Sequence, residues 1–212
     1  MKSYAELAAS VIISQKGNDT VLLHQDSSLS LVGTGRSAFV FRIQSTNYAL
    51  KVFFPSFKHI ALEEAEIYRG LKGISYFPEL YGVGENFIVI DFIQGDTLFE
   101  CLRKGIRVSK HHIEEIDLAL QLARERGFNP SDIHLRNLLV TTQNEIMIID
   151  VARFRQTKNC QQWSDIKTVY HKFYLSPFFP KKIPSFILNK MASLYKKHLL
   201  QRWFNQVNLA GK

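Results

Sequence analysis

Cysteine is scarce in this sequence, and the two cysteines lie far apart. Cys101 and Cys160 form no C-x-x-C pair, and neither has a histidine at metal-ligand spacing. This argues against a disulfide framework and against a zinc site. Two isolated thiols are typical of a protein of the reducing cytoplasm, which is the expected location.

Long hydrophobic runs are also missing. The first apolar stretch, Leu7 to Ile13, is short and follows an acid, Glu6. This beginning lacks the basic start and the small-residue cleavage site of a signal peptide, and no uncharged apolar run approaches the length of a membrane-spanning helix. We therefore expect no transmembrane segment.

Acidic residues are almost absent from the last third of the chain. Residues 151–212 hold 12 lysines and arginines but one acid, Asp165, whereas the first 150 residues have a small net negative charge. Such asymmetry predicts an anionic partner, such as RNA, a membrane surface or an acidic protein. A basic helix face that is merely solvated explains it equally well, and both interpretations stay open.

Apolar residues, in contrast, are plentiful: 46% of the 212 residues are hydrophobic. This suits a folded core in one domain or in two small lobes that share a hinge. The first half alternates like a set of strands, with turn residues between them. We expect strands at residues 20–24, 29–32, 38–43, 48–54, 80–83 and 87–92, and helices at residues 3–13 and 59–71.

The pattern becomes helical after Gln94-Gly95-Asp96, which breaks it. The clearest helix, residues 109–126, begins at a serine cap and ends at a glycine. Further helices are expected at residues 97–103, 162–174 and 185–207, and short strands at residues 138–141 and 146–149. The chain should thus divide into an N-terminal extension (1–28), a first lobe with a sheet and one helix (29–93) and a mainly helical second lobe (94–212).

A glycine-rich turn lies between two of the expected strands, as Gly33-x-Gly35-x-x-Ala38-x-Val40. A Rossmann fingerprint needs a helix after its glycines, so that fold is not indicated. In a hairpin, the glycines would let backbone amides approach phosphates without side-chain obstruction. An ordinary glycine turn is the alternative.

One lysine stands out in the third of these strands, in Ala49-Leu50-Lys51-Val52. A lysine here is usually an exposed member of an alternating pattern, whereas a functional one needs an acidic partner. The following helix offers Glu63, Glu64 and Glu66. We select Glu64, because Tyr68 lies one turn later on the face that could pack inward.

The most informative segment is Pro130-Ser131-Asp132-Ile133-His134-Leu135-Arg136-Asn137, followed by Ile146-Met147-Ile148-Ile149-Asp150. Asp132, Asn137 and Asp150 could converge on one metal-bound phosphate. The alternative is a polar loop with an ordinary aspartate at the end of a strand.

Taken together, these residues make the chain resemble the protein-kinase-like superfamily over about residues 29–154, since the glycine turn, lysine, glutamate, loop acid and amide, and final acid occur in that order. The resemblance is to the minimal kinases, both RIO-type and small bacterial Ser/Thr kinase-like proteins. It implies an α+β, bilobal fold with an antiparallel sheet in the N-lobe and a reduced, mainly helical C-lobe.

The resemblance also implies roles for particular residues. Lys51 would hold the α- and β-phosphates of ATP, Glu64 would fix Lys51, and Asp132 would orient the acceptor hydroxyl and take its proton. Asn137 and Asp150 would hold Mg²⁺. The other expected nucleotide-binding residues are Gly33, Gly35, Val40 and Ala49, with backbone contacts to adenine from Asp91 and Ile93.

Three features depart from the family pattern. Pro130 stands where a histidine is usual, His134 where a lysine is usual, and Asp150-Val151-Ala152 replaces D-F-G, with no A-P-E after it. None of these changes removes a phosphate or metal ligand. The sequence therefore predicts ATP-dependent transfer to a hydroxyl, most simply of a protein Ser or Thr. A small-molecule kinase and a pseudokinase that senses nucleotide or binds RNA are the alternatives.

Overall fold

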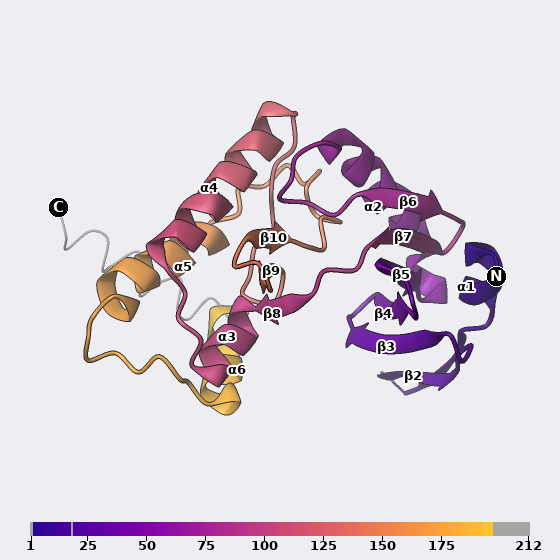
Figure 1. Cartoon of the computed structure of the whole chain (residues 1–212), viewed down its shortest axis with the longest axis horizontal. Helices are drawn as coiled ribbons and strands as arrows, with labels where there is room; N and C mark the ends of the chain where they lie inside the picture. The colour runs from indigo at the N-terminus through magenta and orange to yellow at the C-terminus, as the bar shows by residue number, and fades with distance from the viewer. Residues whose placement is uncertain (1, 18, 197–212) are drawn as a thin grey trace.

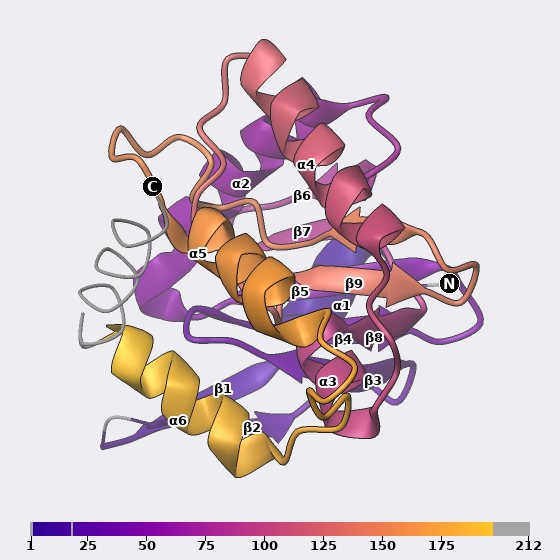
Figure 2. The same cartoon turned by 90° about the vertical axis from the view of Figure 1, so that its left-hand side faces the viewer.

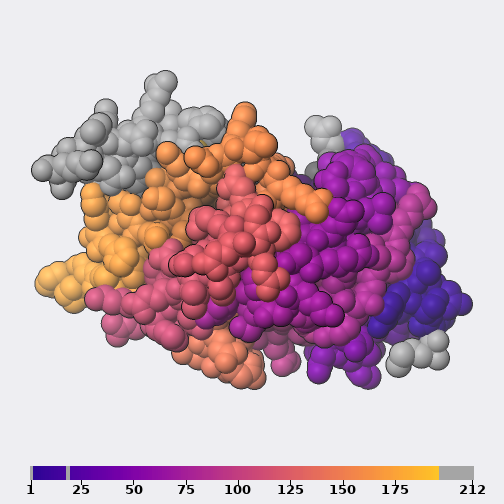
Figure 3. Space-filling view, turned by 90° about the horizontal axis from the view of Figure 1, so that it is seen from above, coloured from indigo at the N-terminus to yellow at the C-terminus, as the bar shows by residue number. Residues whose placement is uncertain are grey.

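Strands dominate the first half of the chain and helices the second half in the computed structural model, which describes residues 2–17 and 19–196 (Figure 1). The antiparallel sheet with its two helices, α1 (Tyr4–Ala9) and α2 (Lys58–Leu71), forms one lobe, and most of the other helices form the second (Figures 1 and 3). The chain passes from the first lobe to the second between β7 (Phe87–Asp91) and β8 (Gly95–Thr97). The predicted α+β fold class is confirmed, and its arrangement is that of a bilobal kinase-like fold.

The first lobe is built on a five-stranded antiparallel sheet with the strand order β3-β4-β5-β7-β6. Its strands occupy the regions expected from the alternating pattern. Their bounds are β3 (Leu29–Thr34), β4 (Ala38–Ile43), β5 (Tyr48–Phe53), β6 (Leu80–Val83) and β7 (Phe87–Asp91).

Strand β5 is buried on both faces, which decides the environment of its lysine. Leu50 and Val52 belong to the core on one side of the sheet, and Ala49 and Phe53 to the core on the other side. Because side chains alternate along a strand, Lys51 shares the face of Ala49 and Phe53. It therefore faces the interior and is not an exposed member of an alternating pattern.

Helix α2 (Lys58–Leu71) covers that face and follows a short 3₁₀ turn, η1 (Pro55–Phe57). Ala61 and Ala65 are fully buried, as is Glu64 between them. The small alanines let the helix approach the sheet closely. As a result, a carboxylate on α2 lies deep between helix and sheet.

The N-terminal segment differs from the expected helix over residues 3–13. Helix α1 (Tyr4–Ala9) ends early, and residues Ile12–Lys16 form β1, which pairs antiparallel with β2 (Asp19–His24). Consecutive branched residues, from Val11 to Ile13, favour extended backbone over helix. Gly17 has a φ of 61° in the turn, a conformation that suits glycine.

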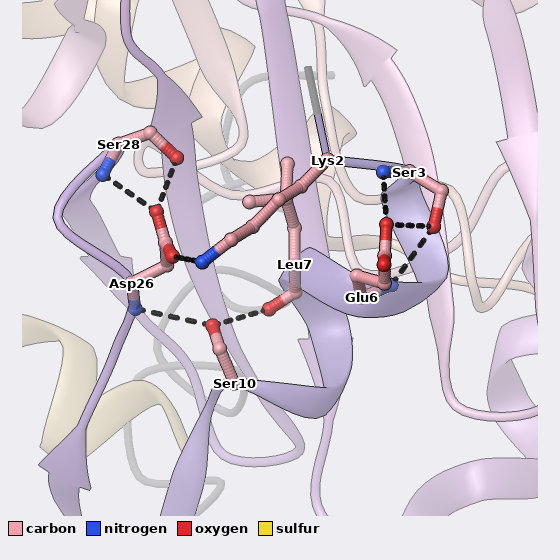
Figure 4. A network of polar contacts seen from close by, with 7 residues as sticks. All are labelled: Lys2, Ser3, Glu6, Leu7, Ser10, Asp26 and Ser28. Atoms are coloured by element: carbon pink, nitrogen blue, oxygen red, sulfur yellow. Dashed lines mark hydrogen bonds and ion pairs between the residues drawn. The ribbon is translucent and has the colours of Figure 1, made fainter.

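Polar contacts hold this segment to the first lobe (Figure 4). Ser3 caps α1 reciprocally with Glu6, and the Ser10 hydroxyl donates to Leu7 O and accepts from the Asp26 amide at 3.1 Å. Lys2 forms an ion pair with Asp26, and this contact, with the Ser28 donors, holds the pKa of Asp26 well below its usual range. Leu7 packs in the core beneath the sheet.

The second lobe contains most of the helices of the described chain, and the sequence predicted the ends of its first two helices well. Thr97 caps α3 and Ser109 caps α4, while Gly105 and Gly127 adopt positive φ after the two helices. The elements are β8 (Gly95–Thr97), α3 (Leu98–Lys104), α4 (Lys110–Glu125), β9 (Leu138–Thr141), β10 (Ile146–Ile148), α5 (Gln162–Val169), the π-helical turn η2 (Tyr170–Tyr174) and α6 (Ser185–Lys196).

Strand β8 was not expected, because Gln94-Gly95-Asp96 resembles a break. It forms the edge of a three-stranded sheet with the order β10-β9-β8, in which Gly95 pairs with Thr141. A Cβ atom on Gly95 would lie 2.3 Å from Val140 O. The glycine thus permits a close backbone approach, which a local pattern cannot reveal.

Replacing Gly95 by alanine should therefore destabilise the protein by roughly 2–3 kcal/mol, since backbone atoms must move to admit the methyl group. Urea unfolding of the two proteins measures this difference. Gly33→Ala is the matched control, because a Cβ there meets Val40 at an ordinary 3.5 Å. An equal free energy of unfolding for Gly95→Ala and Gly33→Ala would contradict the close packing.

Helix α6 lies against α3 through Leu188, which packs with Phe99 and Ile183 and near Leu135 (Figures 1 and 2). The expected helix 185–207 is present as far as Lys196. Residues 197–207, with Lys197, Arg202 and Trp203, lie outside the described residues, so binding of RNA or an acidic protein there stays a prediction. None of the helices within residues 2–17 and 19–196 is long and apolar enough to cross a membrane.

Candidate active site

A buried lysine joins the two lobes at the centre of the molecule. Lys51 Nζ donates to both carboxylate oxygens of Glu64, at 2.9 and 2.8 Å, and to Asp150 Oδ1 at 3.2 Å. Lys51 comes from β5, Glu64 from α2, and Asp150 from the segment just after β10. Two neighbouring elements of the first lobe thus meet, at one ammonium group, a residue that lies 99 positions after Lys51 in the sequence.

Burial and charge compete at this cluster. Lys51 is 8% exposed and Glu64 is fully buried. Burial disfavours the charged form of Lys51, but the carboxylates of Glu64 and Asp150 outweigh it and raise the pKa of the ammonium. Lys51 is therefore a fixed positive charge in the interior.

The two carboxylates respond in opposite directions. Burial raises the pKa of Glu64 to about 7, although Lys51 attracts its anion. Lys51 lowers the pKa of Asp150, against a smaller effect of desolvation. The side chain of Asp150 is half-exposed, whereas that of Glu64 has no exposed surface. Glu64 therefore contacts Lys51 away from solvent, while Asp150 also presents an anion to solvent.

The predicted catalytic loop places its acid and amide side by side. Asn137 Nδ2 donates to the backbone oxygen of Asp132 at 3.2 Å. Among the described residues, Asn137 Oδ1 and the Asp132 carboxylate accept no hydrogen bond. Both are therefore oxygen groups that remain available to a ligand.

Both candidate acids have unusual backbone conformations. Asp132 and Asp150 each have a φ of 62°, in the left-handed region that L-residues rarely adopt. The described chain contains two other non-glycine residues with positive φ, Ser45 and Asn144, and these lie in turns. Backbone strain is typical of functional sites, where the surrounding structure maintains it.

Hydrogen bonds tie the catalytic loop to the segment that contains Asp150. The Ile149 amide donates to Asn137 O at 2.9 Å, and the Asn129 amide donates to Phe154 O at 2.7 Å. The Asn129 side chain also donates to Gln156 O at 2.7 Å. These contacts hold Asp132, Asn137 and Asp150 in one rigid arrangement.

The glycine-rich turn between β3 and β4 has a bulge at Val32, and Gly33 pairs with Val40. The Gly35 amide donates to Ala38 O at 2.9 Å, so this amide already has a partner within the hairpin. Among the described residues, the amides of Arg36 and Ser37 make no backbone hydrogen bond. If this turn binds phosphate, these two amides at its tip are the available donors.

The remaining predicted nucleotide residues lie along the same sheet. Val40 and Ala49 are on β4 and β5, on the face that carries Lys51. Asp91 ends β7, and its carboxylate accepts from the Glu79 amide at 2.8 Å and from the Tyr81 hydroxyl at 2.9 Å. Ile93 follows in the segment that joins the lobes, and its backbone makes no hydrogen bond within the described chain.

Tyr68, which the sequence placed on the inward face of its helix, is buried one turn after Glu64, as expected. Two arginines near this site, in contrast, carried no recognisable signal in the sequence. Arg36, at the glycine turn, and Arg153, just after Asp150, approach the Asp132 carboxylate. A lone arginine in a short loop resembles any solvated surface residue, so only the fold shows where it points.

Comparison with known proteins gives one relative of nearly identical length. No family profile matches the chain. A protein of Bacillus subtilis (strain 168) with the name "Putative serine/threonine-protein kinase YrzF" is 46% identical to it over 209 residues, which cover 97% of each chain. The similarity therefore spans both lobes.

Proposed function

This chain belongs to the family of YrzF from Bacillus subtilis, and on that premise we propose that it is an ATP-dependent kinase that phosphorylates a serine or threonine hydroxyl of a protein. One observation carries the proposal. It is the contact of Lys51 with Glu64 and Asp150, next to the loop that holds Asp132 and Asn137.

In this proposal, positioning and charge neutralisation supply most of the catalysis. Lys51 binds the α- and β-phosphates of ATP, and Glu64 keeps its ammonium in place. Asp132 orients the acceptor hydroxyl and accepts its proton while the oxygen attacks the γ-phosphorus. The bond from that phosphorus to the leaving oxygen breaks, and ADP departs with the electron pair.

The oxygen donors suit magnesium, which prefers carboxylate and amide oxygens. Asp150 and Asn137 would hold it. No group of three or more His, Cys, Asp or Glu side chains in the described part of the chain could hold a metal, so phosphate oxygens and water would complete the coordination. When bound, the ion neutralises phosphate charge.

Adenine would lie against the sheet where the lobes join, between Val40 and Ala49 and the backbone of Asp91 and Ile93. Support comes from the inward face of β4 and β5 and from the uncommitted backbone of Ile93.

Incubation with magnesium, ATP labelled on the γ-phosphate and a cell extract tests the reaction. Label on serine or threonine of a protein would support the proposal. Label on a small molecule would favour the alternative indicated by His134, which lies 3.9 Å from the Asp132 carboxylate. Nucleotide binding without any transfer would identify a pseudokinase.

Nucleotide should also stabilise the fold, because ligand that binds only the native state shifts unfolding by mass action. A non-hydrolysable ATP analogue with magnesium, at about 100 times its Kd, should add about 2.7 kcal/mol, or roughly 5–10 °C in Tm. Magnesium alone should change Tm little, since the protein donors are too few. Thermal unfolding measures both, and an unchanged Tm at millimolar analogue would contradict a nucleotide site.

A further inference from the structure

Two arginines and a histidine lie near the carboxylate that would receive the acceptor hydroxyl. Asp132 Oδ2 lies 3.5 Å from Arg153 Nε and 3.9 Å from the Arg36 guanidinium, and His134 approaches the other oxygen. These groups come from the β3–β4 turn, the catalytic loop and the segment after β10. An acceptor hydroxyl placed at Asp132 would therefore lie near arginines from both lobes.

Asp132 is the one carboxylate within ion-pair distance of these two arginines, Arg36 and Arg153, in the described part of the chain. Their side chains are 76% and 50% exposed, and pairs at these distances near solvent are weak. One carboxylate thus faces two exposed guanidinium groups, so both can also contact an added anion.

Within the cluster itself the charges balance, with Asp132, Glu64 and Asp150 against Lys51, Arg36 and Arg153. Glu64 and Asp150, the other acids of the cluster, both contact Lys51. The segment that leaves the site, residues 151–160, contains Arg153, Arg155 and Lys158 but no acid. Arg155 pairs with Glu66 at 2.6 Å. The basic surplus of the last third therefore begins at the candidate site itself.

From this arrangement we propose that the acceptor is a protein segment with an anionic group, a carboxylate or a phosphate, close to its hydroxyl, and that Arg36 and Arg153 bind that group. The inference rests on the proposed kinase function and specifies its substrate class. Arginine suits this task because its planar guanidinium can donate two parallel hydrogen bonds to a carboxylate or phosphate. Acceptors with flanking lysines would be repelled at the same place.

Peptide binding tests the preference without depending on catalysis. Fluorescent peptides with a central serine flanked by aspartate, phosphoserine, alanine or lysine would be titrated with the protein, magnesium and a non-hydrolysable ATP analogue, with fluorescence anisotropy as the readout. The aspartate or phosphoserine peptide, or both, should bind about tenfold more tightly than the alanine peptide. The difference in affinity between the aspartate peptide and the phosphoserine peptide identifies the preferred anion.

Three variants assign the preference to the arginines. Arg36→Gln/Arg153→Gln should abolish it, whereas Arg103→Gln, which removes an exposed arginine of α3 that pairs with Glu100, should retain it. Arg153→Glu should shift the preference toward the lysine peptide. A purely structural role for Arg153 predicts no such reversal.

Equal binding of all four peptides, or no measurable binding of any, would overturn the inference. So would variants that weaken only the binding of the ATP analogue, because the arginines would then belong to the nucleotide site. Failure of the kinase function looks different. In that case the acidic peptides still bind selectively, but no label is transferred to them from ATP.

Discussion

Replacing Asp132 by asparagine should reduce phosphoryl transfer by about 10³-fold while nucleotide binding stays nearly unchanged. General-base catalysis contributes 10²–10⁴-fold in typical enzymes, and asparagine retains the shape but cannot accept the proton. Asparagine is also tolerated at positive φ, so the backbone at Asp132, with its φ of 62°, is maintained. The measurements are the initial rate of label transfer and the Tm shift caused by the ATP analogue.

Asp96→Asn is the control for this experiment, since Asp96 is also a partly exposed acid that pairs with a cation, Lys104. It should keep the wild-type rate. Wild-type transfer by Asp132→Asn would show that another acid serves as the base and that the catalytic-loop assignment is wrong. Loss of folding would appear in the Tm, so it cannot be mistaken for loss of catalysis.

Asp150→Asn should remove the magnesium-dependent part of nucleotide stabilisation and lower transfer by about 10³-fold. The carboxylate contributes both a metal ligand and a charge next to Lys51, and loss of one preorganised electrostatic group costs 10²–10³-fold or more. Weak binding of the nucleotide should remain, because Lys51 still pairs with Glu64 at 2.8 Å. Tm would be measured with the ATP analogue at increasing magnesium concentrations.

The two aspartate variants serve as controls for each other. Both residues have a φ of 62°, and both substitutions are isosteric. Asp132→Asn should keep the magnesium response that Asp150→Asn loses. An intact magnesium response in Asp150→Asn would remove Asp150 from the proposed metal site.

Local signals in the sequence were sufficient to predict most of the helices and strands. Ser109 and Gly127 predicted the two ends of the helix that the structure shows as α4. This was possible because caps and positive-φ glycines act within a few residues of a helix end. Alternation predicted β3 to β7 in the same way. The resemblance to kinases was also visible in the sequence, from the order of Lys51, Glu64, Asp132, Asn137 and Asp150. The fold class that this resemblance implied is confirmed.

Where local signals were weak or ambiguous, the expectation was wrong. Residues 11–13 could end a helix or begin a strand, and pairing with β2 decided for β1. Gly95 resembles a break, yet close approach to Val140 makes it part of β8. In both cases a hydrogen-bonded partner strand, distant or across a turn, outweighs the propensity of the segment.

The sequence by itself determined the elements and the candidate residues, because helix caps, alternation and turn chemistry depend on neighbours along the chain. Only the tertiary structure decided how those residues meet. It buries Lys51 against Glu64 at the interface of sheet and α2, and it brings Arg36 and Arg153 to Asp132 from both lobes. Such contacts join residues 13 to 96 positions apart, so they depend on strand register and lobe packing, which no local pattern encodes.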